Sequence, residues 1–221
     1  MKKHKHYYDK KYPLLYYAEG GMYSIHPILL IKLYQAYFHQ KPKSFFDCGA
    51  ACGGIVQMAL DCGIDAHGVE IKKYHQLKST YLIGFNQHRM DGKKEVFHRV
   101  LFPDERLEKL FEDGNIKIKS ILDCNPVQAD LAYFNGILSY FDEDTLYKVL
   151  AKFQNVKMLC AIHNTTEDYA KAQKYGDSLG TCQQLKTIQS NDWWIKTFNQ
   201  NGFRAQYHRQ LHCFIAINSA C

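Results

Sequence analysis

The chain has 221 residues, a length that fits one domain, and 46% of them are hydrophobic, which suffices for a buried core. Its 28 basic and 22 acidic residues give a net charge of +6, which permits an acidic or nucleic-acid partner without demanding one. No apolar run approaches the length of about 18 residues that a membrane span needs, and the basic stretch Met1–Tyr8 lacks the apolar segment of a secretory signal. The 8 cysteines contain no Cys-x-x-Cys pair for zinc, so we expect reduced thiols, no metal site and a cytoplasmic protein.

Tyrosine is concentrated ahead of the first expected core element, as Tyr7, Tyr8, Tyr12, Tyr16, Tyr17 and Tyr23. Gly20-Gly21 interrupts this stretch, and Ser24 then favours the start of a helix that continues to Phe38. Two interpretations of the tyrosines stay open: a packed extension, or a lid that closes over a ligand. We expect the arm and its helix to form residues 1–39 and a core domain to form residues 40–221.

A strand, a glycine-rich turn and a helix are expected over residues 44–62. The apolar run 44–46 ends in Asp47, and the turn that follows contains Gly49, Ala51, Gly53 and Gly54. A second apolar run, residues 64–69, ends in another acid, Glu70. Strand, tight turn and helix begin a parallel α/β unit, whose turn can hold a ligand at the N-terminus of the helix.

Two helices are expected next. Tyr74, Leu77, Tyr81 and Phe85 recur at helical spacing and predict one long helix over residues 72–88. Further helix is predicted over residues 95–113.

Strands are then expected at residues 116–123, 129–134 and 156–162, with a helix that Asp142 caps before the last of them. Residues 164–189 are polar and indicate an insertion or a mobile segment. Ser190 opens a further helix, and residues 203–210 and 211–218 predict two strands that pair antiparallel.

The pattern of Asp47, Gly49 and Gly53, followed by Glu70, resembles the class I S-adenosylmethionine (SAM)-dependent methyltransferases. Their first strand ends in Asp-x-Gly-x-Gly-x-Gly, and their second ends in an acid. Ala51 stands in place of the middle glycine and adds a methyl group where the backbone approaches the ligand. The C-terminal antiparallel pair is also similar to this family. The resemblance implies an α/β fold with a Rossmann-like doubly wound seven-stranded sheet, mostly parallel with a C-terminal antiparallel strand.

The resemblance also implies SAM as cofactor and assigns its binding residues. The backbone N–H groups from Gly49 to Gly53, with Ala51 between them, would hold the methionine carboxylate, and Asp47 would favour the amino group. Glu70 would accept hydrogen bonds from the ribose hydroxyls. Asp123 resembles the acid that takes the adenine amino group, with Cys124 beside the ring.

The acceptor side is less defined. Because the sulfonium already activates the methyl group, catalysis needs mainly positioning and loss of the acceptor's proton. The candidate catalytic residues are Asn135, His163 and Tyr17, with His163 a possible general base because its ordinary pKa lies near neutrality.

Several alternatives stay open. Gly49, Ala51 and Gly54 fit a dinucleotide-binding loop equally well, although Asp47 would repel a pyrophosphate. Residues 123–126 resemble the Asn-Pro-Pro-Tyr box of nucleic-acid amino methyltransferases only in part. Residues 17–19, 68–70 and Asn135 resemble the non-SET histone lysine methyltransferases, which favours a protein side chain as acceptor. A small-molecule methyltransferase and a non-catalytic binding module with this fold are the other hypotheses.

Overall fold

The computed structural model describes residues 27–74, 82–87, 96–101, 104–163, 165–174, 185–209 and 211–221. The tyrosine-rich stretch at residues 7–23 lies outside these ranges. Its role as lid or packed extension therefore stays a prediction, as does the division of the chain at residue 39.

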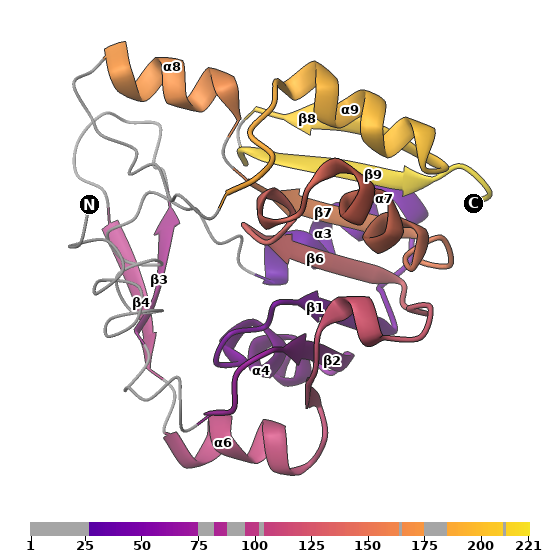
Figure 1. The fold of residues 1–221 in the computed structure, drawn as a ribbon. Helices are drawn as coiled ribbons and strands as arrows, with labels where there is room; N and C mark the ends of the chain where they lie inside the picture. The colour runs from indigo at the N-terminus through magenta and orange to yellow at the C-terminus, as the bar shows by residue number, and fades with distance from the viewer. Residues whose placement is uncertain are drawn as a thin grey trace.

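Seven strands form one sheet in the order β5-β2-β1-β6-β7-β9-β8 (Figure 1). They are β1 (Ser44–Cys48), β2 (Asp65–Glu70), β5 (Ile116–Ile118), β6 (Leu131–Asn135), β7 (Met158–Ile162), β8 (Phe203–His208) and β9 (Cys213–Asn218). The first five pair in parallel, whereas β9 pairs antiparallel with both β7 and β8. The predicted Rossmann-like sheet, mostly parallel with a C-terminal antiparallel strand, is confirmed.

Helices cover both faces of this sheet. They are α3 (Pro27–Phe38), α4 (Gly54–Asp61), α6 (Asp104–Glu112), α7 (Glu143–Ala151), α8 (Thr166–Lys174) and α9 (Asn191–Gln200). Two single turns of 3-10 helix, η1 (Ile121–Asp123) and η2 (Leu138–Tyr140), follow β5 and β6. Two predicted caps are confirmed: Asp142 accepts the Thr145 N–H at 2.9 Å, and Ser190 accepts the Trp193 N–H at 3.2 Å. Ser24, the third predicted cap, lies outside the described residues.

Alternation along the strands divides the core into two clusters, one on each face. The first contains side chains of α3, α4 and α6, and we call its side the α3–α4 face. The second contains side chains of α7 and α9, and we call its side the α7–α9 face. On β7, Cys160 belongs to the first cluster and Ala161 to the second. Every residue of β7 is buried, as expected for a central strand covered by helices on both faces.

A polar network closes the sheet at the N-terminal ends of its parallel strands. Asp130, just before β6, accepts the Lys43 N–H at 2.6 Å and forms an ion pair with Lys157 at 2.8 Å. The Asp130 N–H donates to Ser44 Oγ at 2.9 Å. Because these groups come from the segments before β1, β6 and β7, they fix the register of the three central strands.

The predicted helix over residues 72–88 is wrong in its last part. Residues Leu82–Gln87 form β3, which pairs antiparallel with β4 (Val96–Leu101) in a separate two-stranded sheet (Figure 1). The sequence around Phe85 satisfies both periods, because Ile83 and Phe85 also alternate at strand spacing. Branched and aromatic residues favour strands, and pairing with β4 satisfies the backbone groups.

Other boundaries also differ from the prediction. The helix predicted over 95–113 begins only at Asp104, because Val96–Leu101 belong to β4 and Pro103 disfavours helix in the residue before it. The third strand of the main sheet ends at Ile118, and η1 occupies only Ile121–Asp123 at the end of the predicted range 116–123. Residues 164–189, predicted as an insertion, contain α8.

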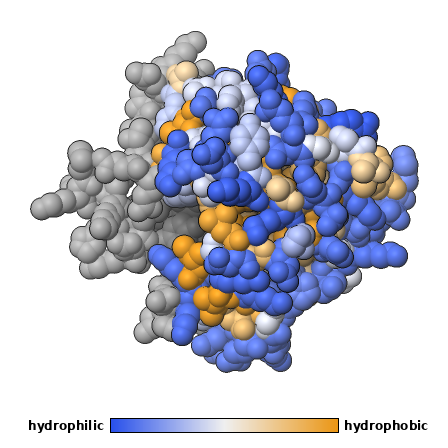
Figure 2. Space-filling model, turned by 45° about the vertical axis from the view of Figure 1, so that its right-hand side comes forward, coloured by the Kyte–Doolittle hydropathy of each residue, from blue (hydrophilic) through white to orange (hydrophobic). Residues whose placement is uncertain are grey.

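The described part of the face in Figure 2 is mainly hydrophilic, with hydrophobic atoms gathered near its centre. No helix within the described ranges is both long enough and apolar enough to cross a bilayer.

Candidate active site

The turn after β1 is held in a shape that glycine adopts most easily. Gly49, Ala51 and Gly53 have φ values of 79°, 47° and 86°, all in the left-handed region. A Cβ at Gly49 would lie 2.8 Å from the side chain of Ile137, so the position also demands a small residue. The turn already uses several of its own donors: the Gly49 and Ala50 N–H groups donate to the Val69 carbonyl at 3.0 and 2.9 Å, and the Gly53 N–H donates to the Ala50 carbonyl at 2.8 Å. These three N–H groups are therefore engaged within the turn, and the prediction that they hold a carboxylate is not supported by their hydrogen bonds.

Glu70 ties this turn to the end of β2. Its Oε2 accepts the buried Ala51 N–H at 2.9 Å, and its Oε1 accepts the N–H groups of Ile71 at 2.8 Å and Lys72 at 3.2 Å. The side chain itself is buried. A carboxylate has about four lone-pair sites, so three N–H donors leave about one for a further donor.

Asp47 lies beside this arrangement on the α3–α4 face. It pairs with Gly68 across β1 and β2, and Glu70 is two residues further along on the same face. Asp47 is only 3% exposed. Burial, and secondly the charge of Glu70, raises the pKa of Asp47 to about 8. Burial also raises the pKa of Glu70, although its three backbone N–H donors oppose that rise.

The η1 turn carries the predicted adenine-binding residues. Asp123 is exposed, whereas Cys124 is buried and its Sγ lies 3.5 Å from the Ser120 carbonyl. Lys152 Nζ donates to the Cys124 carbonyl at 2.7 Å and so holds the turn against the end of α7. The structure thus leaves the Asp123 carboxylate open to a ligand and buries its neighbour.

Two apolar side chains near these turns were missed by the sequence analysis. Ile71, directly after Glu70, is 70% exposed, and Leu122 in η1 is 39% exposed. Exposure of large apolar side chains next to polar strand ends suits a flat, partly apolar ligand. An apolar residue placed directly after a strand-ending acid is the signal that could have identified Ile71.

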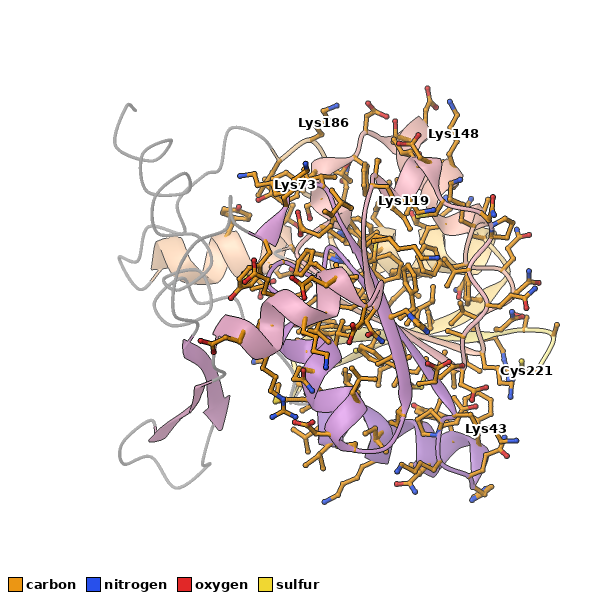
Figure 3. The ribbon with its side chains drawn as sticks, turned by 90° about the horizontal axis from the view of Figure 1, so that it is seen from below. Lys43, Lys73, Lys119, Lys148, Lys186 and Cys221 are labelled. Atoms are coloured by element: carbon orange, nitrogen blue, oxygen red, sulfur yellow. The ribbon has the colours of Figure 1, made fainter. Side chains whose placement is uncertain are left out.

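Positive charge lies at the same ends of the strands. Lys73 follows β2 by three residues, and the Lys119 N–H donates to the Glu70 carbonyl at 2.9 Å. Figure 3 shows these two lysines on one side of the molecule and Lys43, which precedes β1, on the opposite side. Among the described residues, no group of three or more His, Cys, Asp or Glu side chains could hold a metal ion.

The candidate catalytic residues lie on different faces of the sheet. Asn135 ends β6 in the same alternation as Tyr133, so it shares the α3–α4 face with Asp47 and Glu70. His163 follows β7 in the alternation of Ala161, so it lies on the α7–α9 face. Burial lowers the pKa of His163 to about 3, which keeps its ring neutral. Tyr17 lies outside the described residues.

Solved structures share this fold. The sugar N-methyltransferase KedS8 from Streptoalloteichus sp. matches with a TM-score of 0.58 at 8% identity, over 92% of this chain and 91% of that one. A Burkholderia thailandensis 1,6-didemethyltoxoflavin-N1-methyltransferase, with bound 1,6-didemethyltoxoflavin and S-adenosylhomocysteine, matches at 0.56 and 10% identity, over 98% and 84%. Human N-acetylserotonin methyltransferase in complex with SAM matches at 0.55 and 15% identity, over 91% and 54%, so this chain spans about half of that protein.

No protein-family model matches the chain, and no curated protein matches it. At these sequence identities the likeness to the solved structures is one of fold. The chain has the fold of the class I SAM-dependent methyltransferases.

Proposed function

We propose that the chain is a SAM-dependent methyltransferase that acts on a small-molecule acceptor. The observation that carries the proposal is the left-handed turn Gly49–Gly53, held by the Ala51–Glu70 hydrogen bond at the carboxyl ends of β1 and β2. In open α/β sheets, ligands bind at this edge, where the strand order reverses. Here β1 is the reversal point, because the chain moves outward from it to β2 and β5 and then back to β6.

Several of the described residues suit parts of SAM. Asp47 is a buried carboxyl group suited to an amino group. Glu70 keeps about one lone-pair site for a ribose hydroxyl. The exposed side chains of Ile71 and Leu122 suit the two sides of a purine ring, with Asp123 open to its amino group.

When bound, SAM would supply an activated methyl group to the acceptor, which would lose a proton, and S-adenosylhomocysteine would remain. The protein's task is then to align the acceptor and exclude water. Asn135 shares a face with Asp47 and Glu70, which favours it as the residue nearest the transfer. The catalytic roles of Asn135, His163 and Tyr17 stay predictions.

A small-molecule acceptor replaces the expected protein side chain. The short likenesses around residues 17–19, residues 68–70 and Asn135 are the support for a lysine acceptor. The three solved relatives above are described as methyltransferases of a sugar, of 1,6-didemethyltoxoflavin and of N-acetylserotonin. Their acceptors favour the small-molecule alternative for this chain.

Thermal unfolding with S-adenosylhomocysteine tests the cofactor, with NAD as the control for a dinucleotide site. A ligand at about 100 times its Kd stabilises a folded protein by about 2.7 kcal/mol, which is readily measured as a rise in Tm. A rise with NAD and none with S-adenosylhomocysteine would overturn the proposal.

Methyl transfer from labelled SAM tests the acceptor class. A cell lysate is separated into a small-molecule filtrate and a desalted protein fraction, and each is incubated with the enzyme. We expect label in the filtrate products. Label only in protein would restore the protein-acceptor hypothesis, and ligand binding without transfer to either fraction would favour the non-catalytic module.

A further inference from the structure

His163 occupies an aromatic enclosure on the α7–α9 face. Its ring stacks on Phe214 with centroids 4.7 Å apart and planes 9° apart, and the Trp194 ring centroid is 3.8 Å away. His163 is 4% exposed and Trp194 is fully buried. Phe214 in turn contacts Tyr207 at 5.0 Å. The enclosure therefore lies directly beyond the carboxyl end of β7, under α9.

The polar atoms of this enclosure have no partners within the part of the chain that the structure describes. Both His163 ring nitrogens and Trp194 Nε1 are buried without a hydrogen bond there. Ser139 lies in the η2 turn, which follows the neighbouring β6. It is 2% exposed, and its Oγ also has no hydrogen-bond partner among the described residues. Native proteins keep few such atoms because each costs stability, so their concentration at one end of β6 and β7 calls for a ligand.

His163 and Trp194 offer a ligand hydrogen bonds from uncharged groups. Burial lowers the pKa of His163 to about 3, so the imidazole offers one donor and one acceptor, and the indole offers one donor. The nearby carboxylates on α8 are already bonded. Asp168 accepts the Thr165 N–H and O–H at 2.9 and 2.8 Å, and Glu167 accepts the Asn191 N–H at 3.0 Å. A cationic amine would lose its hydration there, whereas the neutral imidazole offers it one acceptor and the indole offers none.

We propose that His163 and Trp194 form a binding subsite for the hydroxyl-bearing end of a neutral aromatic acceptor. The inference rests on the proposed methyltransferase function and adds the chemical class of the acceptor, that of a phenol. The hydroxyl donates to one imidazole nitrogen of His163 and accepts from the indole N–H of Trp194. The subsite holds this end of the acceptor, and His163 serves there as a hydrogen-bonding residue that keeps its protonation state.

Three one-ring probes separate the chemistry. Phenol carries the hydroxyl, toluene has the same shape without it, and benzylammonium carries a positive charge. Binding of each probe is measured by saturation-transfer NMR on the full chain, with and without S-adenosylhomocysteine. We expect phenol to bind at least about tenfold more tightly than toluene, since a hydrogen bond between buried neutral groups is of that order. Equal binding of phenol and toluene, or tighter binding of benzylammonium, would overturn the proposal.

His163→Phe keeps the stacked ring and removes both nitrogens. If those nitrogens await a ligand, the variant should melt at the same temperature or higher, and phenol should bind about tenfold more weakly. Trp194→Phe should weaken phenol binding as well. Trp193→Phe is the matched control, because Trp193 is the partly exposed indole on α9 that packs edge-on against Trp194 at 5.0 Å. Phenylalanine keeps an aromatic ring at that contact and removes only the neighbouring indole N–H, so phenol binding should be unchanged.

A fall in Tm or a failure of His163→Phe to fold would overturn the inference, because it would mean that the nitrogens already have structural partners. Retained phenol binding in the variant would do the same. The S-adenosylhomocysteine melting shift, recorded on the same samples, tests the proposed function independently. If S-adenosylhomocysteine did not raise the Tm of the native chain, the assignment of SAM as cofactor would be refuted. The comparison of phenol with toluene would still test the subsite.

Discussion

Asp47→Asn isolates the effect of one buried carboxyl group on folding. Because the pKa of Asp47 is raised to about 8 from an ordinary value of 3.8, the folded chain keeps this proton over a pH range in which the unfolded chain has lost it. The native state then binds more protons than the unfolded state, so the free energy of unfolding falls as pH rises through this window. The slope from one such group is about 1.4 kcal/mol per pH unit.

Asparagine has nearly the same shape and carries no titrating proton. We therefore compare the free energy of unfolding of the native protein with that of Asp47→Asn. The native value minus the variant value should fall by about 1.4 kcal/mol for each pH unit between about pH 5 and pH 7. Urea unfolding of the ligand-free protein, followed by circular dichroism at several pH values, measures this difference. Asp113→Asn, at an exposed aspartate after α6, controls for the loss of one negative charge.

The result that would refute the reasoning is a difference between native protein and Asp47→Asn that does not change with pH. A difference that rises with pH would mean that Asp47 is stabilised as a carboxylate in the folded chain. Either outcome would remove the physical basis for treating Asp47 and Glu70 as two buried carboxyl groups that compete for ionisation.

Three further substitutions test other parts of the structure. Ala51→Gly should leave the free energy of unfolding unchanged or raise it by up to about 1 kcal/mol, because relief of a left-handed alanine outweighs the greater freedom of glycine in the unfolded chain. Ala59→Gly, inside α4, should instead lower the free energy of unfolding by about 1 kcal/mol. Equal losses for the two variants in urea unfolding would contradict this. Glu70→Ala should lower stability by about 1–3 kcal/mol by leaving the buried Ala51 N–H without its acceptor, and should also abolish the melting shift with S-adenosylhomocysteine; calorimetry that showed native affinity would make Glu70 purely structural. Asp130→Ala should lower stability by about 1–3 kcal/mol and leave that affinity unchanged, and a loss of affinity would show that the two ends of the strands are coupled.

The first α/β unit could be predicted from the sequence because its signals are local. An apolar run, an acid, a turn of small residues and an apolar helix occur consecutively between residues 44 and 62, and each implies the next. The C-terminal antiparallel pair was equally accessible, since only a short connection separates its strands. The region from residue 72 to 113 was not, because helical and strand periods coincide around Phe85 and only pairing with a distant segment decides between them.

The candidate site shows the same division. Asp47 and Glu70 could be identified because they end strands, but the hydrogen bonds that occupy Glu70 depend on how the turn at Ala51 folds back. Asn135 ends β6 and His163 directly follows β7, yet only the register between β6 and β7 and the packing of α9 place them on opposite faces. The neutral state of His163 follows from burial by residues far away in sequence, which a linear pattern does not reveal.

Separation of the two faces has a consequence for exchanging parts between proteins of this fold. The groups proposed for the cofactor come mostly from one continuous stretch, residues 47–72, whereas the aromatic enclosure is built from residues 163–214. A chimera that replaces the chain after Asn135 would therefore keep the proposed nucleoside-binding half of this chain and would receive the donor's counterpart of the aromatic enclosure as one block. The junction lies at the end of β6, which pairs with β7 from the replaced half. The side chains of the new β7 must therefore pack against those of the retained β6 for the chimera to fold.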